Sequence, residues 1–269
     1  MTVPSEIVSA EPAGTTGPKV QVGGLWFDAL TEADVMEVVG RAWVAGHGGS
    51  IIPVNIDVAR AVAREASLAE LVATGSLVVA DGMPLIWAAK AKGKKLPERI
   101  TGSSLVFSLS AMAAAEERSV YLLGGADGIP ERAADALAAR FAGLNVVGAD
   151  SPPFGFDRTV EGVRQAIDAV VSAAPDLVFV GLGFPRQERL IQRLREEWPG
   201  AWYIACGGAI PMAAGVVSRA APLVQRLGLE WMHRLALEPR RLARRYLRDD
   251  LPFALVLLAR STAERFTLR

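Results

Sequence analysis

Cysteine and histidine are scarce in this chain of 269 residues, which has one cysteine, Cys206, and two histidines. A single cysteine excludes an intramolecular disulfide and fits a reducing compartment. It stands in the apolar run WYIACGG, where a small buried filler is favoured over a nucleophile. The histidines, His47 and His233, are far apart and have no companion cluster, so no metal-ligand spacing is present.

Long apolar runs and an excess of one charge are also missing. The longest apolar run, 251–259 (LPFALVLLA), is half of the ~18 residues that a membrane span needs. The N-terminus has no basic region before an apolar core, so no signal peptide is predicted. The formal net charge is +0 and gives no sign of nucleic-acid binding. However, residues 219–248 hold eight arginines and two acids, which predicts a local cationic patch.

The hydrophobic fraction of 51% is enough for a sizeable core. Short apolar segments without polar alternation are separated by helical segments, a pattern typical of a parallel sheet covered on both faces. We therefore predict an α/β fold with a Rossmann-like, mostly parallel sheet. The predicted strands are 20–27, 50–54, 77–80, 120–123, 145–148, 176–181 and 201–206. Helices are predicted at 31–45 with Thr31 as N-cap, from 57, from 84, at 103–118, 130–141 and 159–173, and from 186.

Three regions follow from this pattern. Residues 1–18 are rich in Pro, Gly, Ser and Thr and are predicted to be a disordered tail. Residues 19–222 form the Rossmann-like catalytic domain, and residues 223–269 form a helical, arginine-rich appendage. At ~100° per residue, one half of a helix in this appendage carries only arginines, while Leu242 and Tyr246 occupy the other half. Those arginines are Arg240, Arg241, Arg244, Arg245 and Arg248.

Polar or glycine residues follow several of the predicted strands. In open α/β sheets, ligands bind beyond the carboxyl ends of the strands, so these residues share one rim. The segment 175–188, PDLVFVGLGFPRQE, is the clearest example, although an ordinary strand–loop–helix joint has the same pattern. The rim residues are Asn55, Asp81 with Gly82, Gly124 with Gly125, and Arg186, Gln187 and Glu188.

Two of these rim positions have competing interpretations. Asp81 follows the apolar strand LVVA, where desolvation would raise its pKa toward a value useful for a general base; alternatively, it caps the next helix. The loop GGADG is either a phosphate cradle at a helix N-terminus or a tight turn without a ligand. It is not a Walker loop, and GLGFPRQ has Arg186 where a dinucleotide fingerprint has its third glycine. A nicotinamide-dependent oxidoreductase is therefore poorly supported.

The arginine-rich helix also has more than one interpretation. A solvated surface face is the default for a run of charge. Arginine without lysine favours recognition of anionic lipid headgroups or of a diphosphate, and the apolar run beside it favours a membrane. RNA binding is disfavoured because no aromatic-interleaved motif accompanies the charges.

Taken together, the motifs resemble the WecG/TagA/CpsF glycosyltransferases, also called glycosyltransferase family 26, over roughly 20–246. The segments GLGFPRQE and GLEWMHRLALEPRR, in this order and at this separation, are the most specific. The other matching segments are VNIDVARAV, VVADGMPLIW, RITGSSL, YLLGGADG and CGGAI.

The resemblance implies transfer of a sugar from a UDP-sugar to a polyprenyl-diphosphate-linked acceptor, with inversion and without a metal or other cofactor. The sugar would be N-acetylmannosamine, its uronic acid, glucose or a similar one. By resemblance Asp81 is the catalytic base, and the arginines from Arg234 onward belong to an appendage that closes over the site. The residues expected to bind substrate are Asn55, Gly82, Arg99, Thr101, Gly124, Gly125, Gly183, Pro185, Arg186, Gln187, Glu188, Gly207, Gly208, Arg234, Arg241 and Arg244.

The resemblance also implies a cytoplasmic protein held peripherally on the anionic inner face of the bacterial plasma membrane. No nucleic acid is expected as a partner, and a homo-oligomer is compatible with the sequence. Two departures from the family pattern, Pro53 and the displaced Pro222, bear on the donor sugar more than on the reaction. A non-catalytic membrane adaptor is the alternative if the arginine-rich helix alone is functional.

Overall fold

A computed structural model describes residues 17–218, 224, 230–237 and 239–267 of the chain. The predicted disordered tail, 1–18, lies almost wholly outside the described residues. So does most of 219–229, where the boundary between the catalytic domain and the appendage was predicted.

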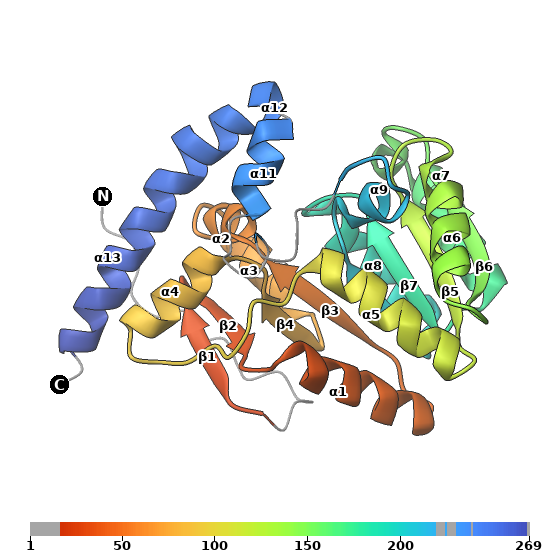
Figure 1. Cartoon of the computed structure of the whole chain (residues 1–269), viewed down its shortest axis with the longest axis horizontal. Coiled ribbons are helices and arrows are strands. Elements are labelled where there is room, and N and C mark those ends of the chain that lie inside the picture. The colour runs from red at the N-terminus through yellow and green to blue at the C-terminus, as the bar shows by residue number, and fades with distance from the viewer. Residues whose placement is uncertain (1–16, 219–223, 225–229, 238, 268–269) are drawn as a thin grey trace.

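The predicted parallel α/β sheet is confirmed (Figure 1). Six strands, every neighbouring pair parallel, lie in the order β4-β3-β8-β7-β5-β6. After β4 the chain crosses to the other half of the sheet, so the reversal of strand order lies beside β3 and β8. Their bounds are β3 Gly49–Val54, β4 Leu77–Ala80, β5 Ser119–Gly124, β6 Asn145–Asp150, β7 Leu177–Gly181 and β8 Trp202–Ala205.

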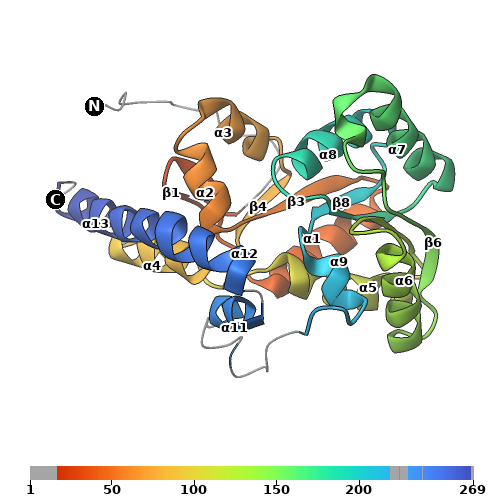
Figure 2. The ribbon, with the colours of Figure 1, turned by 90° about the horizontal axis from the view of Figure 1, so that it is seen from above.

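Helices cover both faces of this sheet, as Figure 2 shows. One face packs against α1 (Glu32–Val44), α5 (Gly102–Ala115), α6 (Ile129–Arg140) and α9 (Ala209–Ala213). The opposite face packs against α2 (Ile56–Val62), α3 (Ala66–Ala73) and α4 (Met83–Ala91) at the β3–β4 end, and against α7 (Val160–Ala173) and α8 (Arg186–Glu197) at the β5–β7 end. This double cover explains why β3, β4 and β8 are buried along their whole length.

One element prediction is wrong. The segment 20–27 is not one strand but an antiparallel hairpin of β1 (Lys19–Val22) and β2 (Leu25–Asp28). Gly23 and Gly24 make the turn at φ of 60° and 82°, which suits the two-residue turns that match strand twist. The helix predicted from about residue 57 is confirmed as α2, and a further helix, α3, follows it. The predicted N-cap of α1 is also confirmed, because Thr31 and Asp34 form a reciprocal capping box.

The predicted helical appendage is confirmed for its described residues. It comprises α11 (Glu230–Leu237), α12 (Pro239–Ala243), the π-helical η2 (Arg244–Asp250) and α13 (Leu251–Thr267). Pro252 lacks the N–H that would reach the carbonyl of Arg248, which accounts for irregular bonding just before α13. In Figure 1, α13 (blue) runs beside α4. Lys92, the C-cap of α4, forms a salt bridge with Glu264 of α13 at 2.7 Å. Within the described residues, no helix is long and apolar enough to cross a bilayer.

Candidate active site

A cavity of about 410 Å³ lies at the carboxyl ends of β4, β3 and β8, a size usual for small-molecule sites. Its floor is polar and comes from strand ends and the loops after them. The appendage closes it from above with residues of α11, η2 and α13. Eight residues of the predicted site line this cavity: Asn55, Asp81, Gly82, Arg99, Thr101, Gln187, Gly207 and Gly208.

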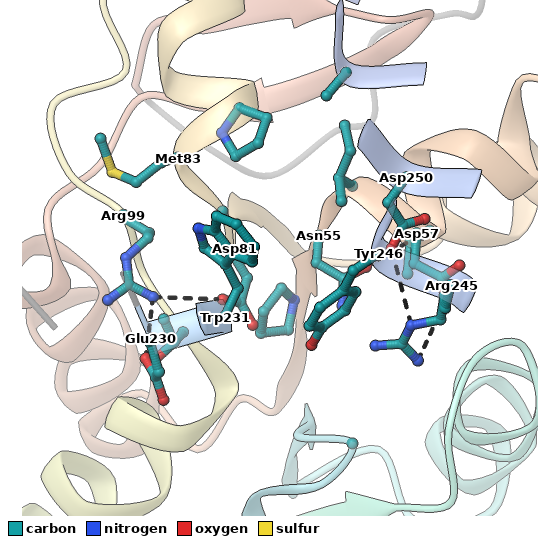
Figure 3. A pocket seen from close by; sticks show the side chains of 18 of the residues that line it. Asn55, Asp57, Asp81, Met83, Arg99, Glu230, Trp231, Arg245, Tyr246 and Asp250 are labelled. Carbon is teal, nitrogen blue, oxygen red and sulfur yellow. Dashed lines mark hydrogen bonds and ion pairs between the residues drawn. The ribbon is translucent and has the colours of Figure 1, made fainter. Parts of the chain in front are cut away.

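Asp81 and Asn55 lie side by side because their strands are neighbours (Figure 3). The Asp81 backbone N–H donates to the Val54 carbonyl at 2.8 Å. Asn55 is the N-cap of α2, and its Oδ1 accepts from the N–H of Val58 at 3.0 Å. The cap explains why asparagine suits this position even before a ligand is considered.

The alternative role of Asp81, as a cap of the next helix, is wrong. The N-cap of α4 is Gly82, which makes no side-chain cap hydrogen bond. The Asp81 carboxylate instead accepts from the N–H of Gly102 at 3.4 Å and lies 4.0 Å from Arg99 Nη1. Its side chain is 27% exposed and faces the cavity, so an acceptor hydroxyl can reach it. The raised pKa expected for Asp81 stays a prediction.

Arg99 joins the strand ends to the appendage. The Ile100 N–H donates to the Ala80 carbonyl at 2.9 Å, which holds the Arg99 segment beside the end of β4. The guanidinium then lies 3.4 Å from Glu230 of α11 and, more distantly, near Asp81 (Figure 3). A cation is thereby fixed next to the candidate base.

Gln187 is buried, and its amide ties two strand-end loops together. Its Oε1 accepts from the N–H of Gly183 at 3.0 Å and from the N–H of Gly207 at 3.2 Å. Its Nε2 donates to Glu188 at 2.9 Å. Apart from their chain neighbours, no atom of the described residues lies within 4 Å of the place where a Cβ of Gly207 or Gly208 would stand, so a ligand can approach their backbone closely.

Glu188 does not line the cavity, although the sequence predicted it to bind substrate. It is 2% exposed, and among the described residues its Oε2 has no hydrogen-bond partner. Burial raises the pKa of Glu188 to about 7. Its contact with Gln187 makes it a support for that amide.

This pKa has a testable consequence for stability. Because the native state binds a proton that the unfolded state has lost, wild-type stability falls as the pH rises from 4.5, the ordinary pKa, to about 7. That difference corresponds to roughly 3 kcal/mol. We expect Glu188→Gln to be more stable than wild type at pH 8 by about that amount and equal to it near pH 4.5, measured by urea unfolding. Glu196→Gln, an exposed acid on the same helix, is the control. An equal gain at both pH values would contradict the buried-proton explanation.

The other residues that were predicted to bind substrate either do not line the cavity or have side chains that the structure does not describe. Gly124 is explained by packing, because a Cβ there would stand 2.5 Å from the Gly181 carbonyl oxygen. Gly125 has a φ of 102°, a backbone conformation that favours glycine, and it lies beside Ile129. Gly183 and Pro185 form the turn before α8, and Arg186 and Arg244 are exposed and do not line the cavity. The side chains of Arg234 and Arg241 are outside the described residues.

The structure adds an ionic cluster that the sequence did not reveal, which we call the clasp: Asp57 and Arg60 of α2 with Arg245 and Asp250 of η2. Figure 3 shows three of its members, Asp57, Arg245 and Asp250. Arg60 bonds to Asp57 and lies 3.0 Å from Asp250, while Arg245 lies 3.7 Å from Asp57 and 3.8 Å from Asp250. Burial, with Asp57 nearby, raises the pKa of Asp250. The arginine-rich pattern indicated the helix but not which arginine turns inward.

Aromatic side chains of the cavity were also missed. Trp231 of α11 and Tyr246 of η2 meet edge to face, with ring centroids 6.3 Å apart, and Trp87 and Phe184 line the same space. Cys206 lines the cavity but is buried, as predicted for a filler. Burial raises the pKa of its thiol to about 12, so the reactive thiolate is not populated at neutral pH.

Comparison with known proteins agrees with this geometry. The sequence model of the glycosyl transferase WecG/TagA/CpsF family matches residues 20–266. The chain belongs to this family. It is therefore a glycosyltransferase, and the oxidoreductase and adaptor alternatives do not describe it.

Two curated relatives carry the name N-acetylglucosaminyldiphosphoundecaprenol N-acetyl-beta-D-mannosaminyltransferase. The relative from Bacillus spizizenii strain W23 is 28% identical over 194 residues, covering 72% of this chain and 73% of that protein. The relative from Bacillus subtilis strain 168 is 27% identical over 192 residues, covering 71% of this chain and 73% of that protein.

Proposed function

We propose that this glycosyltransferase moves a sugar from a UDP-sugar to a hydroxyl of a sugar carried on a polyprenyl diphosphate, in the synthesis of a cell-surface polysaccharide. One observation carries the proposal: Asp81 shares a cavity with Asn55, Gln187 and Arg99 at the carboxyl ends of the strands. The names of the two Bacillus relatives, which specify a lipid diphosphate acceptor, support the acceptor class.

In the proposed reaction Asp81 is the general base. As the acceptor oxygen attacks C1 of the donor sugar, its proton passes to the Asp81 carboxylate. The bond from C1 to the phosphate oxygen breaks, and UDP leaves from the face opposite the attack, which inverts the anomeric centre. Arg99, Arg245 and the backbone N–H groups near Gly207 and Gly208 supply positive charge toward the leaving diphosphate. We propose the same role for Arg234 and Arg241 and expect no requirement for a metal.

The donor that we propose first is UDP-N-acetylmannosamine, because both relatives are named for transfer of that sugar. Pro53 lines the cavity at the position where the family pattern differs. A donor of altered shape, such as the uronic acid derivative or UDP-glucose, therefore belongs in the same screen.

We also propose that the protein works peripherally on the cytoplasmic face of the plasma membrane. The appendage supports this, because its exposed surface combines apolar and basic side chains. Such a surface attracts anionic lipid and buries its apolar groups at the interface. The exposed residues of the appendage that do not line the cavity include Arg240, Arg244, Arg248 and Val256.

The test is a screen of UDP-sugars against an N-acetylglucosaminyl diphosphate on a short polyprenyl chain, read by mass spectrometry. We expect one donor to add a single sugar to the acceptor with release of UDP. A thermal shift with UDP and none with NAD is the accompanying binding test. If every donor leaves the acceptor mass unchanged while UDP also fails to bind, the proposal is wrong.

A further inference from the structure

We infer that the side of α13 facing the cavity, together with α4, binds the first isoprene units of the lipid diphosphate acceptor. The inference rests on the proposed function and names a subsite within its cavity. It differs from attachment to the membrane surface, because the occupant is the substrate's own hydrocarbon chain.

The first support is the chemistry of the cavity wall. The residues that α4 contributes to the lining are apolar: Met83, Pro84 and Trp87. The residues that α13 contributes are also apolar: Leu251, Ala254, Leu255 and Leu258. The strand ends opposite contribute Asp81, Asn55 and Gln187. The cavity therefore has a polar floor and an apolar wall, which suits an amphiphile with a polar head and a hydrocarbon tail.

The second support is the exposure of large apolar side chains at this wall. Leu247 of η2 and Leu251 and Leu255 of α13 follow one another at intervals of four residues along the appendage. Each is between 50% and 59% exposed, although all three line the cavity. Trp87 and Trp231, 48% and 43% exposed, line it from α4 and α11. Apolar groups that are left open beside a polar site indicate a binding surface.

The third support is the division of α13 into different sides. Ala254, Leu257 and Ser261 are buried, and Leu257 reaches the turn of the β1–β2 hairpin at Gly23. Val256 is 49% exposed but does not line the cavity. Val256 is therefore open to a bilayer but not to the cavity. Leu255 and Leu251 lead into the cavity toward Asp81, and a flexible hydrocarbon chain attached to a diphosphate can lie along them.

The length of the stretch that carries these three leucines sets the size of the subsite. The eight steps from Leu247 to Leu255 rise at most about 12 Å, roughly the length of two to three extended isoprene units. Affinity should therefore increase over the first units and then level off.

The test measures the binding of dimethylallyl, geranyl and farnesyl diphosphate, which carry one, two and three isoprene units. Each is titrated into the full chain below its micellar concentration, without detergent or vesicles, and followed by calorimetry. We expect the Kd to fall about tenfold with each added unit. Leu255→Ser is expected to raise the Kd for farnesyl diphosphate about tenfold, and Val256→Ser, the matched control, less than about twofold. Leu251→Ser changes a second side chain of the apolar wall and is expected to weaken farnesyl diphosphate binding in the same way.

Equal Kd values for the three diphosphates would overturn the inference. So would equal weakening of farnesyl binding by Leu255→Ser and Val256→Ser, because the tail would then lie elsewhere. Sugar transfer is assayed separately with acceptors of the same three tail lengths. If sugar transfer occurs with a KM that does not depend on tail length, the inferred subsite is wrong, but the proposed function stands. Length-dependent binding without transfer by any UDP-sugar supports the subsite and contradicts the proposed reaction.

Discussion

Asp81→Asn is expected to lower kcat for sugar transfer about 1,000-fold, in the middle of the range that a general base contributes. The amide keeps the size of the carboxylate but cannot take the proton of the attacking hydroxyl. Affinity for UDP should stay within a factor of about three, because the carboxylate acts on the acceptor and not on the nucleotide. Steady-state kinetics of transfer and calorimetric titration with UDP measure the two quantities.

Asp127→Asn is the matched control for this variant. Asp127 is an exposed aspartate in the loop that follows β5, at the same edge of the sheet, and it does not line the cavity. Its replacement should leave kcat unchanged. Full turnover by Asp81→Asn would remove Asp81 from the role of base, and a parallel loss of UDP affinity would assign it to nucleotide binding instead.

Arg60→Met is expected to release the appendage from the catalytic domain. The Arg60 and Asp250 side chains are 13% and 6% exposed, so removal of the cation leaves a buried carboxylate with only the more distant Arg245. Loss of one partner of a buried pair costs about 3 kcal/mol or more. Amide hydrogen exchange in 239–267 should accelerate about 100-fold, the equivalent of that free energy, and kcat should fall because the cavity loses its cover.

Two controls separate the clasp from ordinary surface charge. Arg164→Met removes a cation whose partners, Asp168 and Glu197, are about half exposed, and it should leave stability and exchange nearly unchanged. The double variant Arg60→Met with Asp250→Leu removes both charges and should recover much of the lost protection. Unchanged exchange in 239–267 after Arg60→Met would show that other contacts hold the appendage.

The elements of the sheet could be predicted because their signals are local. The strand over 77–80 was predicted with its observed bounds, since a run of four buried apolar residues is closed on both sides by turn residues. The capping pair of Thr31 and Asp34 identified the start of α1 in the same way. The hairpin at 19–28 was missed because its turn, Gly23–Gly24, interrupts an apolar stretch too short to count as two strands.

The candidate site was predicted in part. Asn55 and Asp81 could be found because each follows directly after a strand, and Gln187 because it opens the helix after the β7 loop. Parallel strands bring their carboxyl ends to one edge. Arg245 was not distinguished from its neighbour Arg244, since in a run of arginines only the bonding of η2 decides which one turns toward α2. Gly124 looked like part of a ligand loop, but its neighbour is the backbone of β7.

The sequence by itself determined the alternation of strands and helices, the family and the candidate base, because those depend on residue order and local hydrophobic pattern. Only the tertiary structure decided which residues enclose the reaction. Asp57, Trp87, Arg245 and Leu255 are separated by up to about 200 positions in the chain, and they share a cavity because α2, α4 and the appendage pack together. Their proximity results from packing and buried charge pairing across the whole fold, which no local pattern in the chain encodes.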